Sequence, residues 1–171
     1  MIDQAQEDTL LELLNTAPMV RDAVQDELAD PQTARPWQQA HGGSGSEEER
    51  RHLIAARDAL QEVIRGRREP ASLTALLEGV SSRPTVGGDG IAWELDAPAE
   101  RRAAVDAVLT WAALRQAKPG RLRPCANPDC RLFLVDRSKS NKARWCSMAV
   151  CGNRMKARRH YERAHRAPAA R

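Results

Sequence analysis

The sequence predicts a mainly α-helical fold with a small β component, followed by a short cysteine-rich unit. Apolar residues recur with helical spacing in several segments between residues 3 and 116. Residues 83–95 instead alternate apolar and polar side chains around a glycine-rich turn, which is typical of a β-hairpin. All four cysteines fall between positions 125 and 151. We therefore expect a helical N-terminal part and a separate C-terminal unit.

The first helix is predicted over residues 3–15, where Ile2, Leu10, Leu13 and Leu14 contribute to an apolar stripe. The polar residues and the proline that follow are expected to end it. Its apolar stripe should face the core of the N-terminal part.

Two more helical segments are expected before the first long helix. Residues 20–28 place apolar side chains at helical spacing. Asp30 and Pro31 then fit the N-cap and first position of another helix. Pro36 should break or kink that helix, because proline lacks an N–H group and clashes with the preceding turn. The glycine-rich residues 42–45 are expected to form a flexible link.

Three later helices complete the N-terminal part. Ser46 and Glu49 predict a capping box for a long helix through about residue 65. Pro70 opens a helix that closes at Gly79, and Pro98 opens one that runs to about residue 116. In this last helix the residues expected to point inward are Val105, Val108, Leu109 and Ala112.

The hairpin predicted near 83–95 lies between these last two helices. Ile91, Trp93 and Leu95 alternate onto one face of its second strand. Trp93 is expected in the core rather than stacked on a cofactor, and so are Trp37 and Trp111.

The four cysteines form two pairs of equal spacing. Cys125 and Cys130 enclose four residues, as do Cys146 and Cys151, and fifteen residues separate the pairs. Four thiolates arranged in this way suit one structural Zn²⁺ ion and leave it no open position. The alternatives are disulfides or buried thiols without a metal. Since no apolar signal segment opens the chain, we expect a cytoplasmic protein with reduced thiols.

The residues around the cysteines predict a treble-clef-like finger. Residues 127–129 form a turn inside the first pair, and residues 132–135 are a short apolar strand. Arg144 and Trp145 are a candidate second strand. Ser147 is a candidate N-cap for a helix that continues to about residue 165.

This unit resembles the CGNR zinc finger. The resemblance rests on the stretch from Arg144 to Arg159, which contains Cys151-Gly-Asn-Arg, on the first cysteine pair, and on the residues from Phe133 to Ser138. The family places an N-terminal domain called ABATE before the finger and is described as stress-induced bacterial transcription regulators. A looser resemblance to that domain lies in residues 13–16 and in Trp37 before Gly42.

Charge divides the chain into two unlike halves. Residues 121–171 carry 14 basic and 3 acidic residues, a net charge of +11, whereas residues 1–120 have a net charge of −7. The halves either have different partners or neutralise each other across an internal interface. Basic side chains on a small rigid finger suit contacts with nucleic-acid phosphates. The candidates are Arg137, Lys139, Lys142, Arg144, Arg154, Lys156, Arg158, Arg159 and Arg163.

Residues 1–120 show no catalytic pattern. They contain no cysteine, and His41 and His52 have no recognisable acid or base partner in the sequence. The glycines of the hairpin lack the strand-to-helix setting of a phosphate loop. No apolar run approaches the roughly 20 residues that span a bilayer. We therefore expect neither an enzyme nor a membrane protein.

The resulting prediction is a helical, ABATE-like domain over residues 1–118, a finger over 121–166 and a tail over 167–171. The family resemblance implies a transcription regulator that binds DNA through the finger. The N-terminal domain would sense a small ligand, form a homodimer or recruit a partner. Two alternatives remain: an RNA-binding protein, and a protein-interaction module that binds no nucleic acid.

Overall fold

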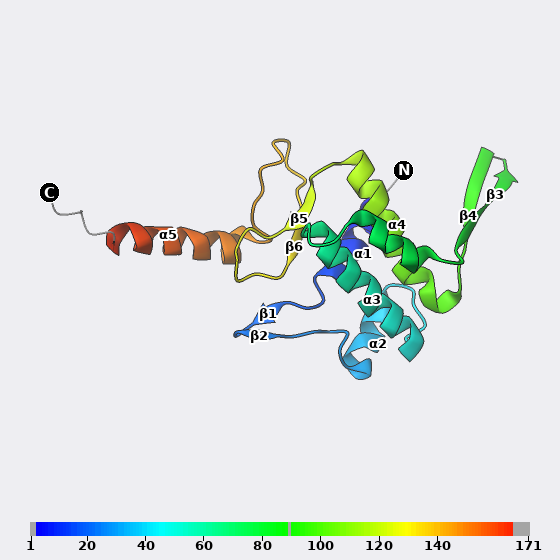
Figure 1. Ribbon diagram of the computed structural model, residues 1–171, viewed down its shortest axis with the longest axis horizontal. Helices are drawn as coiled ribbons and strands as arrows, with labels where there is room; N and C mark the ends of the chain where they lie inside the picture. Colours follow the sequence, from blue (N-terminus) through cyan, green and yellow to red (C-terminus); the bar gives the residue numbers. More distant parts are fainter. Residues whose placement is uncertain (1–2, 89, 166–171) are drawn as a thin grey trace.

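The computed structural model describes residues 3–88 and 90–165, so Ile2 and the predicted tail lie outside the described residues. The elements follow one another as shown in Figure 1. The helical part contains α1 (Gln4–Leu14), α2 (Pro31–Ala40), α3 (Glu47–Ile64), the 3₁₀-helix η1 (Pro70–Leu77) and α4 (Ala99–Ala117), with the strands β1 (Met19–Val20), β2 (Ala23–Val24), β3 (Ser81–Gly87) and β4 (Gly90–Asp96). The C-terminal unit contains β5 (Leu122–Pro124), β6 (Phe133–Val135), the π-helical turn η2 (Met148–Gly152) and α5 (Asn153–His165).

The core lies where α1, α3 and α4 pack together. This confirms the predicted fold class: the chain is mainly helical, and its strands occur in short antiparallel pairs. None of the described helices is long and apolar enough to cross a membrane. The buried side chains of the core cluster include Leu10, Leu13, Leu14, Leu28, Leu53, Leu60, Leu73, Val108, Trp111 and Leu114.

The predicted caps of α2 and α3 are confirmed, with one difference at α3. Asp30 accepts a hydrogen bond from Gln32 N, and Ser46 accepts one from Glu49 N at 3.2 Å. The Glu49 side chain does not return to Ser46 N, as a capping box would require. It accepts from Ser44 and Gly45 instead, so the predicted flexible link is held by hydrogen bonds.

The helix predicted over residues 20–28 is wrong. Two short strands, β1 and β2, occupy this stretch, joined by Arg21 and Asp22 with φ of 48° and 63°. Asp26 accepts a hydrogen bond from Leu28 N and pairs with Arg57 on α3. These tertiary contacts override the weak helical pattern of the segment, because helix propensity alone contributes little free energy.

Of the break or kink predicted at Pro36, the break does not occur. The helix α2 is continuous from Pro31 to Ala40. A proline removes one hydrogen bond of the helix, at its own nitrogen. The capped start at Asp30 and the turn closed by His41 N on Trp37 O keep both ends of this ten-residue helix formed.

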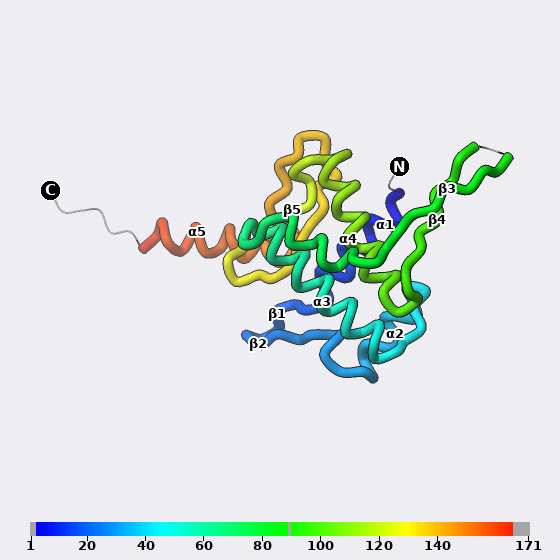
Figure 2. Tube along the Cα trace, turned by 45° about the vertical axis from the view of Figure 1, so that its right-hand side comes forward, coloured from blue at the N-terminus to red at the C-terminus, as the bar shows by residue number. Residues whose placement is uncertain are grey.

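The hairpin β3–β4 is confirmed, but its tryptophan is not buried. The ribbon projects from the helical part (Figure 2). Trp93 pairs with Pro84, and Ile91 pairs with Val86, so one face of the ribbon is apolar. Trp93 is nevertheless 67% exposed, contrary to the prediction. Alternation predicted the strand correctly but could not show whether another element covers the apolar face.

The inward face of α4 differs from the prediction at two positions. Val105 and Val108 are buried as expected, whereas Leu109 is 40% exposed and Ala112 also faces solvent. Trp111 and Leu114 are buried in their place. The buried stripe is therefore rotated about the helix axis from the predicted one.

The C-terminal unit is joined to the helical part through β6. Its partner strand is β5, so the strand predicted at residues 144–145 is wrong. Phe133 is 1% exposed and belongs to the core cluster of the helical part. The Asn15 side chain, at the end of α1, donates to Phe133 O and accepts from Phe133 N. An amide that pairs with both backbone groups of a residue takes the place of a neighbouring strand.

Replacing Asp26 tests the contact that holds the β1–β2 segment on α3. The Arg57 side chain is only 4% exposed and donates to both carboxylate oxygens of Asp26. Asp26→Asn should lower the free energy of unfolding by about 2 kcal/mol, since it leaves a buried charge with a weaker partner. Urea titration at pH 7 measures this, with the exposed turn substitution Asp22→Asn as control.

The same variant gives a pH signature. Arg57 and a backbone hydrogen bond lower the pKa of Asp26 below its usual 3.8, although burial opposes them. The stabilisation is then complete above about pH 5 and is lost as the pH falls through the folded-state pKa. The gap between wild type and Asp26→Asn should narrow below about pH 4. A gap that is unchanged down to pH 3 contradicts the ion pair.

Candidate metal centre and basic surface

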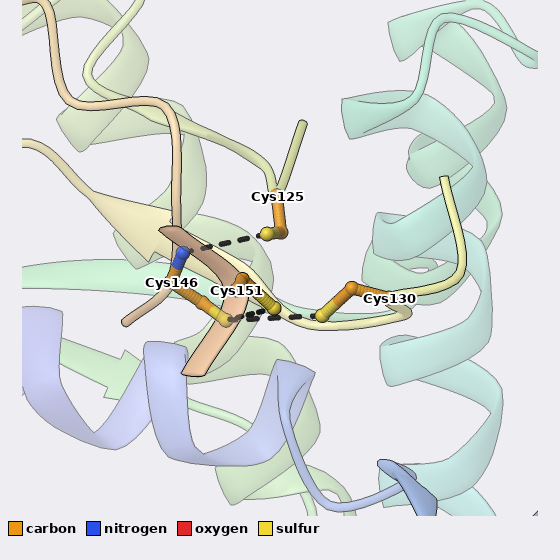
Figure 3. A group of neighbouring side chains, drawn as sticks. All are labelled: Cys125, Cys130, Cys146 and Cys151. Carbon is orange, nitrogen blue, oxygen red and sulfur yellow. Dashed lines mark hydrogen bonds between the residues drawn. The ribbon is translucent and has the colours of Figure 1, made fainter. Parts of the chain in front are cut away.

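The first cysteine pair lies on a tight turn after β5. Cys125 N donates to Leu132 O, and Cys130 N donates to Asn127 O, at 2.8 and 2.9 Å. The Asn127 side chain accepts from Asp129 N, which forms the turn predicted from this sequence. The turn directs both thiols toward the second pair (Figure 3).

The second pair is carried by the start of the last helix. Ser147 caps η2 by accepting from Val150 N, as predicted, and Cys151 lies within that turn. Gly152 is buried, and a side chain there would stand 2.8 Å from Met148 Sδ and 3.2 Å from Trp145 Cδ1. A side chain at residue 152 would therefore require the Met148 side chain to move away and Trp145 to shift slightly.

The four sulfurs meet at one point. All lie within 4.8 Å of one another, and Cys146 Sγ is 3.7 Å from the sulfurs of both Cys130 and Cys151 (Figure 3). Four sulfurs placed about 2.3 Å from a tetrahedral ion stand about 3.8 Å apart. A disulfide would need roughly 2.05 Å, and all four cysteines are free. The arrangement fits one structural zinc ion, as the spacing predicted.

The electrostatics of the cluster link the ionisation of its thiols to a bound cation. Burial raises the pKa of Cys130 to about 11 and, together with the neighbouring Cys130, raises the pKa of Cys146. Burial also acts on Cys151, but hydrogen bonds from Asn127 and the neighbouring thiols lower the pKa of Cys151. Four adjacent thiols cannot all ionise unless a positive charge lies among them. Bound Zn²⁺ supplies that charge and keeps its ligands deprotonated.

Two donors outside the predicted set support the sulfurs. Asn127 Nδ2 donates to Cys151 Sγ, and Cys146 N donates to Cys125 Sγ, both at 3.4 Å. Such outer contacts orient metal ligands. The Arg154 side chain, from the Cys-Gly-Asn-Arg stretch, is exposed and makes no hydrogen bond to a described residue, so it does not take part in this support. In the sequence, the asparagine between Cys125 and Cys130 is the residue that could have indicated this support of the sulfurs.

Comparison with known families agrees with this geometry. Residues 121–164 match the CGNR zinc finger. The match covers β5, both cysteine pairs and almost all of α5. No curated protein matches the chain. The resemblance of residues 1–118 to an ABATE domain, and the boundary near residue 120, stay predictions.

The nine basic candidates are all exposed, but they fall on two separate elements and not all of them are free of ion pairs. On the loop between β6 and Cys146, Arg137 pairs with Asp8 of α1, and the Arg144 guanidinium lies 5.1 Å from the Trp145 ring centre. On α5, Arg158 pairs with Glu162. The candidates without an ion pair to a described residue are Lys139, Lys142, Arg144, Arg154, Lys156, Arg159 and Arg163.

The basic loop is shaped by one buried carboxylate that the sequence did not reveal. Asp136 is 2% exposed and accepts hydrogen bonds from Ser138 N and Ala143 N at 2.9 and 2.7 Å. The Ser138 hydrogen bonds, with further contributions from Ala143 and Arg123, lower the pKa of Asp136 to about 2. The carboxylate is therefore charged at neutral pH and holds both ends of the loop.

The histidine expected to stand alone has partners. His41 Nε2 lies 2.7 Å from Glu12 Oε2, and Nδ1 lies 2.7 Å from Trp37 O. The Trp37 ring stacks on the imidazole at 4.1 Å between ring centres. Because His41 and Glu12 are 29 positions apart, no local pattern in the sequence indicates the pair.

Replacing one cysteine tests the metal site. Cys151→Ser should reduce bound zinc from one ion per chain to a small fraction, because the closed four-thiolate site is lost. It should also lower the urea midpoint of the helical part, since Phe133 joins that part to the finger. Metal analysis and tryptophan fluorescence report the two effects.

The matched control is His160→Asn, which changes a potential metal ligand on the exposed face of α5. It should keep the full zinc content. Wild-type zinc content in Cys151→Ser would show that Cys151 is not a ligand.

Proposed function

We propose that this chain is a zinc-stabilised DNA-binding protein that regulates transcription, with no catalytic role. The proposal is based on the position and exposure of α5. This helix extends away from the rest of the molecule (Figures 1 and 2), and none of its residues is buried. A helix that does not pack on its own protein is available to a partner.

The chemistry of α5 favours a phosphate-rich partner. Its 13 residues carry Arg154, Lys156, Arg158, Arg159 and Arg163 against one acidic residue, Glu162. The helix would be about 20 Å long, and helices of this kind fit the major groove of B-DNA, which is about 12 Å wide. Basic residues along it would neutralise phosphates and release counterions.

The loop between β6 and Cys146 offers a second set of contacts. Lys139 and Lys142 are exposed there, beside the neutral donors Ser138 and Ser140. Asp136 fixes the loop from inside, so little conformational entropy would be lost on binding. A fixed loop and a projecting helix on one finger give two points of attachment to a nucleic acid.

The helical part would act as the regulatory half. In the family that the sequence resembles, a domain of this kind precedes the finger. Sensing, dimerisation and recruitment of a partner are the roles that such a domain would serve in a transcription regulator.

Salt-dependent binding tests the proposal. The zinc-loaded full chain should bind a random 30-base-pair duplex at low salt, with an affinity that falls steeply as salt rises. Arg159→Ala/Arg163→Ala should weaken binding roughly tenfold at about 100 mM salt and reduce the logarithmic salt slope by about 2. Fluorescence anisotropy measures both quantities.

The control removes two exposed arginines from the helical part, Arg51→Ala/Arg68→Ala, and so makes the same change in net charge. It should bind like wild type. No binding by the zinc-loaded protein at about 50 mM salt would refute the proposal. Stronger competition by a structured RNA of equal length would reassign the partner to RNA.

A further inference from the structure

A cavity lies in the helical part, away from the cysteines. It is an open cavity bounded by α1, α4 and the α2–α3 loop, with a volume of about 650 Å³. Pockets for small molecules usually measure about 300–1,000 Å³. The cavity is therefore large enough to hold a small organic molecule.

The hollow results from small side chains on α4. Ala99, Ala103 and Ala107 follow one another every four residues, so they share the helix face that lines the cavity. Leu10 and Leu13 of α1 contribute from the opposite wall. The cavity thus has an apolar interior of the kind that binds hydrocarbon groups.

An aromatic wall stands beside this interior. Trp37 is half-buried and lines the cavity together with His41, on which its ring stacks. The Nδ1 atom of His41 contacts Trp37 O and the Nε2 atom contacts Glu12, so the imidazole holds the Trp37 ring in place. The indole remains available to a ligand, and indole faces attract cations.

The polar groups of the cavity include a buried carboxylate with no basic partner. Glu49 is 2% exposed, and its Oε2 accepts from Gln38, Ser44 and Gly45, which are all neutral donors. Among residues 3–88 and 90–165, no group donates a hydrogen bond to Glu49 Oε1, and no basic side chain forms an ion pair with this carboxylate. A buried carboxylate is normally paired with a positive charge.

A second carboxylate lines the same cavity. The Asp106 side chain of α4 is exposed, and it makes no hydrogen bond to any residue that the structure describes. Partial desolvation of this carboxyl raises the pKa of Asp106, although the nearby Arg102 acts in the opposite direction. The Arg102 guanidinium donates to Leu95 O rather than to Asp106. Within the described parts of the chain, metal-ligand atoms converge only at the cysteines, so the two carboxylates do not form a metal site.

We propose that this cavity binds a small organic cation, an amine that carries an aromatic or aliphatic group. The ammonium group would lie near Glu49 and Asp106, and the apolar group would lie against Trp37 and the alanines of α4. The proposal does not rest on nucleic-acid binding. The helical part would then select its ligand by a positive charge at one end of the molecule and by an apolar group at the other.

Matched amine and alcohol probes test the proposal on the zinc-loaded full chain. Phenethylamine and tryptamine should bind with dissociation constants below about 1 mM. Phenethyl alcohol and tryptophol, which have the same apolar groups without the charge, should bind at least about tenfold more weakly. Calorimetry gives the affinities, and NMR shifts of the Trp37 indole N–H identify the site.

Two variants locate the interaction. Asp106→Asn should weaken amine binding about tenfold and leave alcohol binding unchanged, whereas Ala103→Leu should weaken both by filling the cavity. Asp22→Asn, in the exposed β1–β2 turn, removes the same charge elsewhere and should have no effect. Zinc content and helical circular dichroism confirm that each variant is folded.

The proposal fails if neither amine binds with a dissociation constant below about 1 mM, if the alcohols bind as tightly as the amines, or if Asp106→Asn binds amines like wild type. Each of these results can be obtained from a protein that still binds DNA, so the two proposals are separable.

Discussion

The packing of one strand residue, Phe133, joins the two parts of this molecule. Its ring is buried in the helical core beneath the Arg65 guanidinium, at 4.3 Å, and its backbone pairs with the Asn15 side chain. The same strand precedes the basic loop and pairs with β5, which leads to the first cysteine. The largest buried side chain of the finger thus belongs to the core of the helical part, and a small unit of this size relies on its metal and on the neighbouring helices for stability.

The charge asymmetry of the sequence is preserved in three dimensions rather than cancelled. Within residues 3–88 and 90–165, a single ion pair, Asp8 with Arg137, joins the acidic part to the finger. Among the described residues, the basic side chains of α5 form no ion pair with an acidic residue of the helical part. The sequence left open whether the acidic and basic halves neutralise each other across an internal interface. The basic charges of α5 are not neutralised in this way. The positive potential of the finger is directed outward, where it would attract an anionic partner.

Patterns that depend on nearby residues were predictable. Each cap and each cysteine pair joins groups that lie at most five positions apart, so the sequence alone predicts them. Other features depend on distant contacts. Asp26 holds the β1–β2 segment in place through its ion pair with Arg57, and His41 pairs with Glu12, which belongs to another helix. Trp93 is exposed because no element covers its face of the hairpin in the described structure, and no local pattern carries that information.

The junction between η2 and α5 has a consequence for how the last helix forms. Starting a helix is the unfavourable step, with an equilibrium constant on the order of 10⁻³, whereas each later residue adds at little cost. The turn of η2 is fixed at Ser147 by its cap and at Cys151 by the metal site, and α5 continues from it without interruption. A 13-residue helix with no buried face would be marginal in water by itself. Zinc bound by Cys151 would thus serve this chain as a helix initiator: the order of α5, and with it the spacing of its positive charges, would depend on an ion held in the turn directly before the helix.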